Sequence, residues 1–292
     1  MELGRFGIWS SPLRRGDESS ALTAIREIES LGFRTAWMPG GEAGLGRRVQ
    51  SLLGAASTLT LAIGIVNIWF HSAAEVLDVH HAAGELGGDR LLSGVGVGHA
   101  PLVDREMPGR YQHPIASMSV YLDELDSGPH PIPRAQRIIG ALGPRMMRLA
   151  GERTAGAHPY LVTPGHTRWA REVMGPDAWL APELHVVVDR DAGRARALGR
   201  QYMAVYLELP NYIANFHRMG FTDADFENGG SDRMIDELVA WGDADTVLAR
   251  AQEHLDAGAD HVALQVLVAD RMTFPLDSWK ALARAQAVHG SV

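Results

Sequence analysis

The feature that most constrains this fold is a regular alternation of short apolar runs with helical segments. Most of the runs are continuously apolar, which is typical of parallel strands buried on both faces. The first four begin at residues 5, 34, 61 and 91, so their starts lie 29, 27 and 30 residues apart. Each interval matches a strand, a crossover helix and two short loops. The eight runs are Arg5–Trp9, Arg34–Met38, Leu61–Val66, Leu91–Gly96, Arg137–Leu142, Ala157–Val162, Leu184–Val188 and His261–Val268.

Helix-start signals lie between these runs. Asp17 and Ser72 can each cap a helix, Pro144 opens another, and Asp277 precedes the last one. Eight strand–helix units predict an α/β fold of the (β/α)8, or TIM, barrel type, in which functional groups gather at the carboxyl ends of the strands. The predicted helices are Glu18–Leu31, Ala73–Leu86, Ile115–Asp126, Pro144–Ala150, Asp245–Ala257 and Ser278–Val288.

The starts of the last two runs, residues 184 and 261, are 77 residues apart, which is too long for one crossover. Three further helices are predicted there, at Gly193–Leu209, Tyr212–Met219 and Asp232–Trp241. We therefore expect a helical insertion between strands 7 and 8, at approximately residues 189–244. A length of 292 residues suggests two domains, but barrels of about 250 residues are single domains, so we expect one domain over residues 1–292.

The competing fold is a doubly wound open sheet, which usually carries a glycine-rich phosphate loop. Gly94, Gly96 and Gly98 follow the fourth run, but the third glycine comes one residue too early for the G-x-G-x-x-G motif. Pro101 also makes the residues after this turn a poor start for a helix. The barrel is therefore the preferred prediction.

Composition excludes several classes of function. The formal net charge of −8 argues against a nucleic-acid-binding protein, because phosphate contacts need a basic surface. The absence of cysteine removes disulfides, thiolate metal sites and cysteine nucleophiles. The one lysine, Lys280, falls in the last predicted helix, so a Schiff-base aldolase is not expected. The longest apolar stretch, Leu59–Phe70, is too short to span a membrane, and no export signal is recognisable at the N-terminus, so we expect a soluble, cytoplasmic protein.

The predicted strand ends are rich in glycine and aromatic residues and poor in carboxylates, which suits a planar ligand lying against the backbone. Gly143 precedes a helix N-terminus, where free N–H groups attract phosphate, and Thr163 and Gly165 follow the next strand. Ordinary βα turns also need glycine and proline, so that interpretation stays open.

His99 is the most informative titratable residue, because it follows the fourth run beside a glycine-rich turn. A general acid/base role suits a group with a pKa near neutrality, and a structural hydrogen bond is the alternative. No metal site is expected, since the remaining candidates lack the H-E-x-x-H spacing. Those candidates are His71, Glu75, Asp78, His80 and His81.

Two blocks, Leu61–Trp69 and Arg90–His99, resemble the luciferase-like monooxygenase superfamily, and most closely its actinobacterial branch that uses the deazaflavin coenzyme F-420. Ala141–Met146 and Ala257–Val262 also fit that branch. The resemblance implies a barrel with an insertion near strand 7, usually a homodimer, with F-420 (or FMN in other branches) across the carboxyl-end face. It also implies a cis peptide bond at Gly64–Ile65.

The resemblance carries site residues over to this chain. It assigns ring contacts to Gly98 and His99 and, at the end of strand 3, to residues near the cis bond. The cofactor-binding set it implies is Gly64, Ile65, Asn67, Gly98, His99, Ala141, Gly143, Thr163 and Gly165.

One departure concerns proton transfer. Many F-420-dependent relatives have Asp-His at the end of strand 2, and Gly40-Gly41 stands there in this chain. The acid/base role then passes to His99 or Glu42, or is supplied by the substrate or by water. The function implied is an F-420-dependent oxidoreductase that transfers hydride between the cofactor and a small organic substrate. The alternatives are an FMN-dependent luciferase-like monooxygenase and a non-catalytic flavin- or deazaflavin-binding protein.

Overall fold

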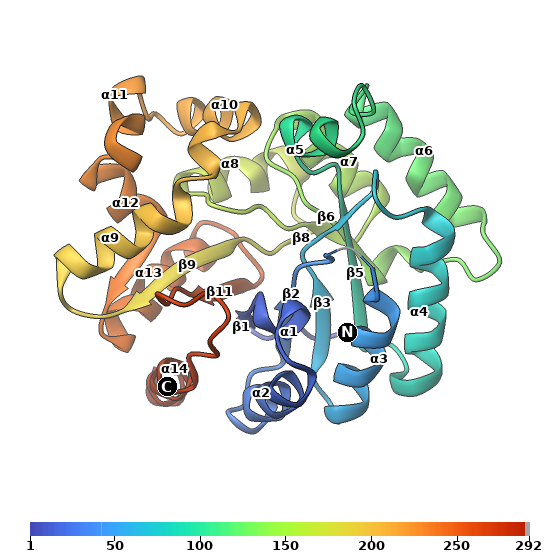
Figure 1. Cartoon of the computed structure of the whole chain (residues 1–292), viewed down its shortest axis with the longest axis horizontal. Coiled ribbons are helices and arrows are strands. Elements are labelled where there is room, and N and C mark those ends of the chain that lie inside the picture. The colour runs from blue at the N-terminus through green and yellow to red at the C-terminus, as the bar shows by residue number, and fades with distance from the viewer. Residues whose placement is uncertain (42, 290–292) are drawn as a thin grey trace.

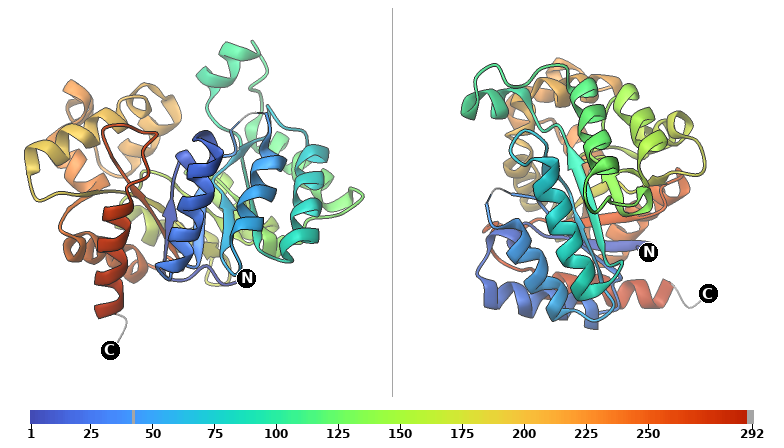
Figure 2. Two further views of the ribbon diagram at one scale, coloured as in Figure 1. Left: turned by 60° about the horizontal axis from the view of Figure 1, so that its bottom comes forward. Right: turned by 90° about the vertical axis from the view of Figure 1, so that its right-hand side faces the viewer.

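The computed structural model describes residues 1–41 and 43–289 and shows parallel strands that curl into a barrel with helices outside (Figures 1 and 2). All pairings between strands in the described residues are parallel. The strands are β1 (Phe6–Trp9), β2 (Thr35–Met38), β3 (Thr60–Ile63), β4 (Val66–Asn67), β5 (Leu91–Gly96), β6 (Arg137–Ile139), β7 (Gly156–Ala157), β8 (Trp179–Leu180), β9 (Glu183–Val188), β10 (Val239–Gly242) and β11 (Val262–Val266).

The four helices predicted in the first half of the chain are present as α2, α4, α6 and α7, whereas α1, α3 and α5 were not predicted. Asp17 accepts from the amide of Ser20 at the start of α2, and Ser72 and Glu75 form a capping box at the start of α4. The α-helices are α1 (Pro12–Arg15), α2 (Glu18–Ser30), α3 (Leu45–Ala55), α4 (Ala73–Gly87), α5 (Ala100–Glu106), α6 (Pro114–Ser127), α7 (Pro144–Arg153), α8 (Pro164–Met174), α9 (Ala192–Met203), α10 (Pro210–Arg218), α11 (Asp223–Phe226), α12 (Asp232–Leu238), α13 (Ala244–Asp256) and α14 (Leu276–His289).

The segment that contains β8 and β9 closes the barrel. Its first part pairs with β7, where the amide of Ala181 donates to the carbonyl of Ala157 at 2.9 Å. Its second part pairs with β11, where the amide of Ala263 donates to the carbonyl of Pro182 at 2.9 Å. The circuit is β1, β2, β3, β5, β6, β7, β8/β9 and β11. The predicted TIM barrel with a helical insertion after its seventh strand is therefore confirmed.

Several predicted elements differ from the structure, two of them most clearly. The predicted helix Asp232–Trp241 ends at Leu238, and the chain continues as β10, which pairs with β9 in the register Val239↔His185. The outer edge of β9 would otherwise leave backbone N–H and C=O groups without partners, and β10 satisfies them. The predicted strand Ala157–Val162 is also shorter, because only Gly156–Ala157 is a strand.

Pro101 does not prevent a helix, contrary to the expectation. It lies in the first turn of α5, which begins at Ala100. An amide at this position has no intrahelical partner, so its absence in proline costs the helix nothing.

The barrel interior is filled by large aromatic side chains that face small residues. Trp9 and Trp37 pack with Ala62, Ala181 and Ala263 in one buried cluster. Trp37 is fully buried, and its indole donates to His261 Nε2 at 2.9 Å. This filling leaves space only above it, at the carboxyl ends of the strands.

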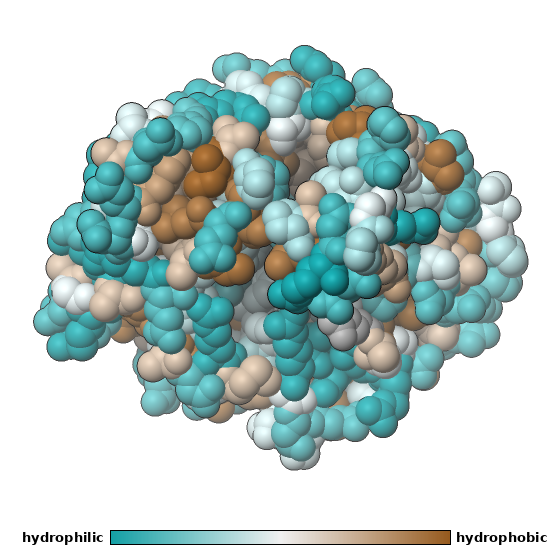
Figure 3. Space-filling view, turned by 45° about the horizontal axis from the view of Figure 1, so that its top comes forward, coloured by the Kyte–Doolittle hydropathy of each residue, from teal (hydrophilic) through white to brown (hydrophobic). Residues whose placement is uncertain are grey.

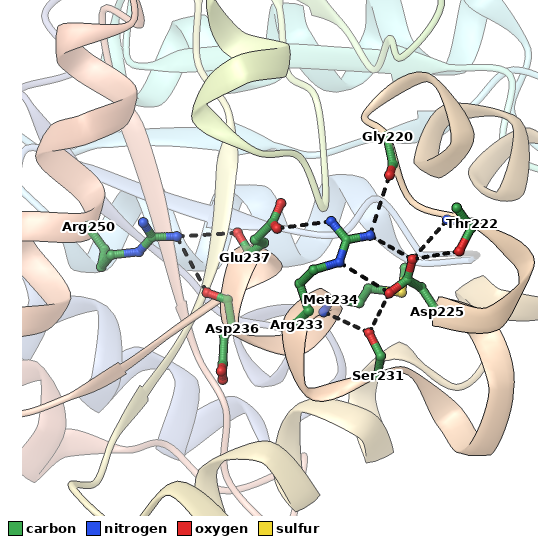
Figure 4. Close-up of polar contacts among 9 residues, drawn as sticks. All are labelled: Gly220, Thr222, Asp225, Ser231, Arg233, Met234, Asp236, Glu237 and Arg250. Atoms are coloured by element: carbon green, nitrogen blue, oxygen red, sulfur yellow. Dashed lines mark hydrogen bonds and ion pairs between the residues drawn. The ribbon is translucent and has the colours of Figure 1, made fainter.

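The insertion forms a lobe beside the barrel (yellow to orange in Figure 1) with its own buried cluster. Figure 4 shows the polar contacts of α11 and α12, where Asp225 accepts from Thr222, Ser231 and Arg233. The Arg233 guanidinium and these donors hold the pKa of the Asp225 carboxyl well below its usual range. In the part of the chain that the structure describes, no helix has both the length and the apolar character needed to cross a bilayer.

Candidate active site

A cavity of about 1030 Å³ opens at the carboxyl ends of the barrel strands, between the strand ends and the insertion. Figure 3 views the molecule with this end turned forward, and apolar surface near the middle of the face is surrounded by hydrophilic side chains. The position is the one at which TIM barrels carry their active sites.

One wall of the cavity is made of backbone at the ends of β3, β5 and β6. Gly64, Gly96, Gly98 and Gly140 line it. Gly98 has a φ of +58°, and a Cβ there would collide with the Asn67 side chain, so glycine is favoured at this position. This wall therefore presents a backbone surface to whatever the cavity binds.

The peptide bond Gly64–Ile65 is cis, as the resemblance implied. The Ile65 side chain fits between two glycines of the wall: a Cβ at Gly96 would lie 2.7 Å from Ile65 Cδ1, and one at Gly140 would lie 3.1 Å from Ile65 Cγ2. Gly64, Ile65 and Asn67, three of the predicted cofactor-binding residues, all line the cavity.

The structure explains why glycine occupies position 40. A Cβ there would lie 2.7 Å from the carbonyl oxygen of Ile65 and 2.8 Å from the Cα of Val66, which are backbone atoms that cannot rotate away. Gly41 has a φ of +68°. Arg14 holds the turn by donating to the Gly40 carbonyl at 2.8 Å, while the His71 ring contacts the Gly41 carbonyl at 2.9 Å. The local backbone thus disfavours the Asp-His pair of the resembled family.

His99 lies at the N-terminus of α5 and lines the cavity. Its Nδ1 is 3.3 Å from Asn211 Oδ1 of the insertion, and its ring is 5.4 Å from that of Tyr212. Burial lowers the pKa of His99 below its usual value, although the contact with Asn211 opposes the shift. The lowered pKa favours the neutral imidazole, and a tautomer that donates from Nδ1 to Asn211 Oδ1 would leave Nε2 as an acceptor.

The other predicted residues fall into two groups. Ala141 and Gly143 line the cavity, whereas Thr163 and Gly165 do not. Thr163 instead caps α8, accepting from the amide of His166. Glu42 lies outside the described residues.

The N-terminus of α7 points its free amides at the cavity. Gly143 is the N-cap residue and forms no side-chain cap bond, so the amides of Arg145 and Met146 have no intrahelical acceptor. All three residues line the cavity. A helix N-terminus with an adjacent arginine is suited to hold a phosphate.

Next to Gly64, two buried polar atoms of cavity-lining residues have no hydrogen-bond partner among the described residues. They are His158 Nε2 and Trp9 Nε1. His158 donates from Nδ1 to the Ala181 carbonyl at 2.7 Å and stacks on Trp37. Burial lowers the pKa of His158 to about 4, so Nε2 is an unprotonated acceptor. The sequence did not single out Trp9 and His158 as site residues, because both fall in predicted strands, where side chains normally pack in the core.

The wall opposite the glycines is made of tyrosines. Tyr202, Tyr206 and Tyr212 come from the insertion, and Tyr160 follows β7. Tyr160 donates to Gln265 Oε1 at 2.8 Å. Burial raises the pKa of Tyr206 to about 12 and also raises the pKa of Tyr160 well above its ordinary value, so these phenols stay protonated and can donate.

The cavity is cationic although the chain carries a net charge of −8. Arg105 pairs with Glu106, whereas no described carboxylate pairs with the other four arginines. This excess of positive charge favours an anionic ligand. The arginines that line the cavity are Arg15, Arg105, Arg145, Arg218 and Arg271.

The histidines that were weighed above as metal ligands, His71, His80 and His81, contact other groups of the protein. His80 contacts Ser93 Oγ at 2.9 Å and Gln136 Oε1 at 2.8 Å. His81 stacks on His130. Together with His71 at the Gly41 carbonyl, these side chains stabilise the barrel exterior and its loops.

Comparison with known proteins gives similarity in structure only. No family model matches the chain, and no curated protein sequence matches it. The coenzyme F-420-dependent tetrahydromethanopterin reductase of Methanopyrus kandleri matches with a TM-score of 0.78 and 17% identity over 99% of each chain. The chain has the fold of the luciferase-like superfamily.

Two further structures support this assignment of the fold. An F-420-dependent secondary alcohol dehydrogenase, solved with an F-420–acetone adduct, has a TM-score of 0.70 at 14% identity, covering 98% of this chain and 99% of its own. The oxygenating component of 3,6-diketocamphane monooxygenase from a Pseudomonas putida plasmid, solved with FMN, has a TM-score of 0.66 at 14% identity, covering 97% and 96%. The resemblance stated from the sequence is confirmed at the level of the fold.

Proposed function

We propose that the chain is an oxidoreductase that uses coenzyme F-420 to transfer hydride to or from a small organic substrate. The observation that carries this proposal is a cationic cavity that joins a glycine wall to a free helix N-terminus. Solved structures of the same fold contain F-420 or FMN, and this similarity supports a cofactor of that kind here.

The described residues fit a tricyclic cofactor with an anionic tail. The glycine wall at Gly64 and Gly98 offers flat backbone for a ring system. The amides of α7 and the Arg145 guanidinium suit a phosphate. F-420 carries more negative charge in its tail than FMN does, and the excess of cavity arginines over carboxylates favours F-420.

Bound F-420 would supply hydride chemistry at its central ring carbon, and the protein would supply position and proton handling. Neutral His99 accepts a proton at Nε2, because Nδ1 faces the amide oxygen of Asn211. The tyrosine wall keeps water away from the ring and presents protonated phenols. We also propose a homodimer, as in the resembled family.

The proposal is tested by titrating the purified protein with F-420, FMN and NADPH. Trp9 lines the cavity, so a bound ring system should quench tryptophan fluorescence. We expect F-420 to bind with the highest affinity and Arg145→Gln to weaken it about tenfold. The matched control is Arg148→Gln on the exposed side of the same helix, which should leave binding unchanged.

Two outcomes would redirect the proposal. Binding of FMN alone would indicate a flavin monooxygenase. Tight binding of F-420 without hydride exchange toward any member of a broad substrate panel would indicate a non-catalytic deazaflavin-binding protein.

A further inference from the structure

We infer that the substrate of the proposed reaction is an organic anion, held through its carboxylate or phosphate by Arg15 and Arg271 beside the Tyr206 hydroxyl. This inference rests on the proposed function, because it assigns the α7 end of the cavity to the cofactor. It concerns a second cationic region of the cavity, which lies away from α7 and is defined here by Arg15, Arg271 and Tyr206.

The two ends lie on opposite sides of the barrel. In the circuit of eight strands, β6, which leads to α7, is the fifth strand, whereas β1 is the first and β11 is the eighth. Arg15 follows β1 and Arg271 follows β11, so these two arginines belong to adjacent strands. A group bound at the α7 amides therefore leaves them on the far side of the cavity.

No described carboxylate lies within ion-pair distance of Arg15 or Arg271, although most carboxylates of the insertion are paired with arginine, as Asp225 and Asp236 are. Arg271 donates to the Gln201 carbonyl at 2.6 Å and lies 4.2 Å above the Tyr202 ring, which orients its guanidinium. Two guanidinium groups at one wall suit a carboxylate or a phosphate.

Tyr206 provides the third group of this end. Its ring lies 5.5 Å from that of Tyr160 and 4.8 Å from that of Tyr212, so it is held within the tyrosine wall. Arg15 and Arg271 line the same cavity as Tyr206, and the Arg271 guanidinium contacts Tyr202 of the same wall. The same wall offers aromatic surface for the body of the substrate.

The inference predicts a preference that can be measured without cofactor. The purified full chain is titrated calorimetrically with benzoate, phenyl phosphate and neutral benzyl alcohol, which share one aromatic ring. We expect an anion to bind at least tenfold more tightly than benzyl alcohol, and added salt to weaken that binding. Tighter binding of benzoate assigns a carboxylate substrate, and tighter binding of phenyl phosphate assigns a phosphate monoester. Equal affinity for all three probes would overturn the inference.

Variants distinguish anion binding at Arg271 from non-specific binding to arginines elsewhere on the surface. Arg271→Gln should weaken anion binding about tenfold, and Arg271→Lys should restore part of the loss because it keeps the charge. Arg26→Gln, an exposed arginine of α2 that does not line the cavity, is the matched control and should have no effect. An unchanged affinity in Arg271→Gln would contradict the assignment.

Cofactor titration of the same variants separates the two proposals. The double variant Arg15→Gln/Arg271→Gln should bind F-420 within twofold of the unmodified protein. A loss as large as that in Arg145→Gln would show that this end holds the cofactor tail, and the inference would fail. If Arg271-dependent anion binding persists but F-420 never binds, the proposed function fails and the anion site stands.

Discussion

The two sides of the cavity are built from different parts of the polypeptide. The barrel side uses backbone, with Gly64, Gly96 and Gly98 excluding side chains, and it rests on buried neutral groups such as His158. The insertion side uses side chains, with tyrosines facing the cavity, and it also carries partly exposed ion pairs such as Asp225–Arg233.

This difference separates two tasks. A backbone wall tolerates almost no substitution, so it suits a ligand whose shape never changes, such as a cofactor ring. A side-chain wall can be altered one residue at a time, so it suits recognition of a particular substrate. The contrast predicts different responses of the two sides to acid and to mutation.

Acid should destabilise the barrel side first, and this is the largest effect we expect. Burial lowers the pKa of His158, His166 and His261 to about 4. The unfolded chain binds protons at these histidines below about pH 6.5 while the folded chain does not, so stability falls as pH drops from 6.5 toward 4. One histidine contributes a loss of the order of 3 kcal/mol over that window.

Urea unfolding at pH 7, 6 and 5 measures this loss. His158→Asn keeps an N–H donor near the Ala181 carbonyl but removes the titration, so its stability should depend less steeply on pH. The control is His113→Asn, an exposed position with a φ of 48°, which asparagine tolerates. A pH profile for His158→Asn that parallels that of the unmodified chain would argue against a neutral buried imidazole.

Substitution at Gly40 should produce the next largest effect. Gly40→Ala places a Cβ 2.7 Å from the Ile65 carbonyl oxygen, and we expect a loss of about 3 kcal/mol in the free energy of unfolding. The matched control is Gly54→Ala in α3, where a Cβ would meet nothing within 4 Å and alanine favours the helix, so stability should not fall. Equal midpoints in urea for the two variants would show that the barrel side adapts to added side chains.

The barrel was predictable because continuous apolar runs and helix caps are local signals. The same local reading failed at β10, where the apolar residues of Val239–Gly242 follow α12 without a turn residue, and pairing with β9 decides their conformation. Tertiary hydrogen bonding overrode the helical pattern there.

The candidate site was predictable only on the barrel side. Gly64, Gly98 and His99 follow strands that the spacing located, so their common position at one end of the barrel could be inferred. Arg15 ends α1 and Arg271 lies in the loop after β11, most of the chain away, and Tyr206 lies in the insertion, so bringing them to one cavity depends on barrel closure. Gly40 looked like a lost functional residue, and only the structure shows the backbone contact that requires glycine there.

The ion pairs of the insertion provide the smallest of the expected effects. Asp225→Asn removes the charge that faces Arg233 and weakens the contacts to Ser231 and Thr222, and we expect a loss of about 1 kcal/mol because solvent screens this partly exposed pair. The control is Asp223→Asn in the same helix. The Asp223 side chain is 93% exposed, so this substitution should change stability by less than about 0.5 kcal/mol.

The pKa of Asp225 lies well below its usual range, so the contribution of its ion pair to stability is present at pH 5 and is lost only in stronger acid. Hydrogen exchange at pH 5 should therefore show α11 and α12 as protected as at pH 7 while the barrel strands have lost protection. The opposite order would mean that the insertion, rather than the barrel, is the acid-sensitive side of the cavity.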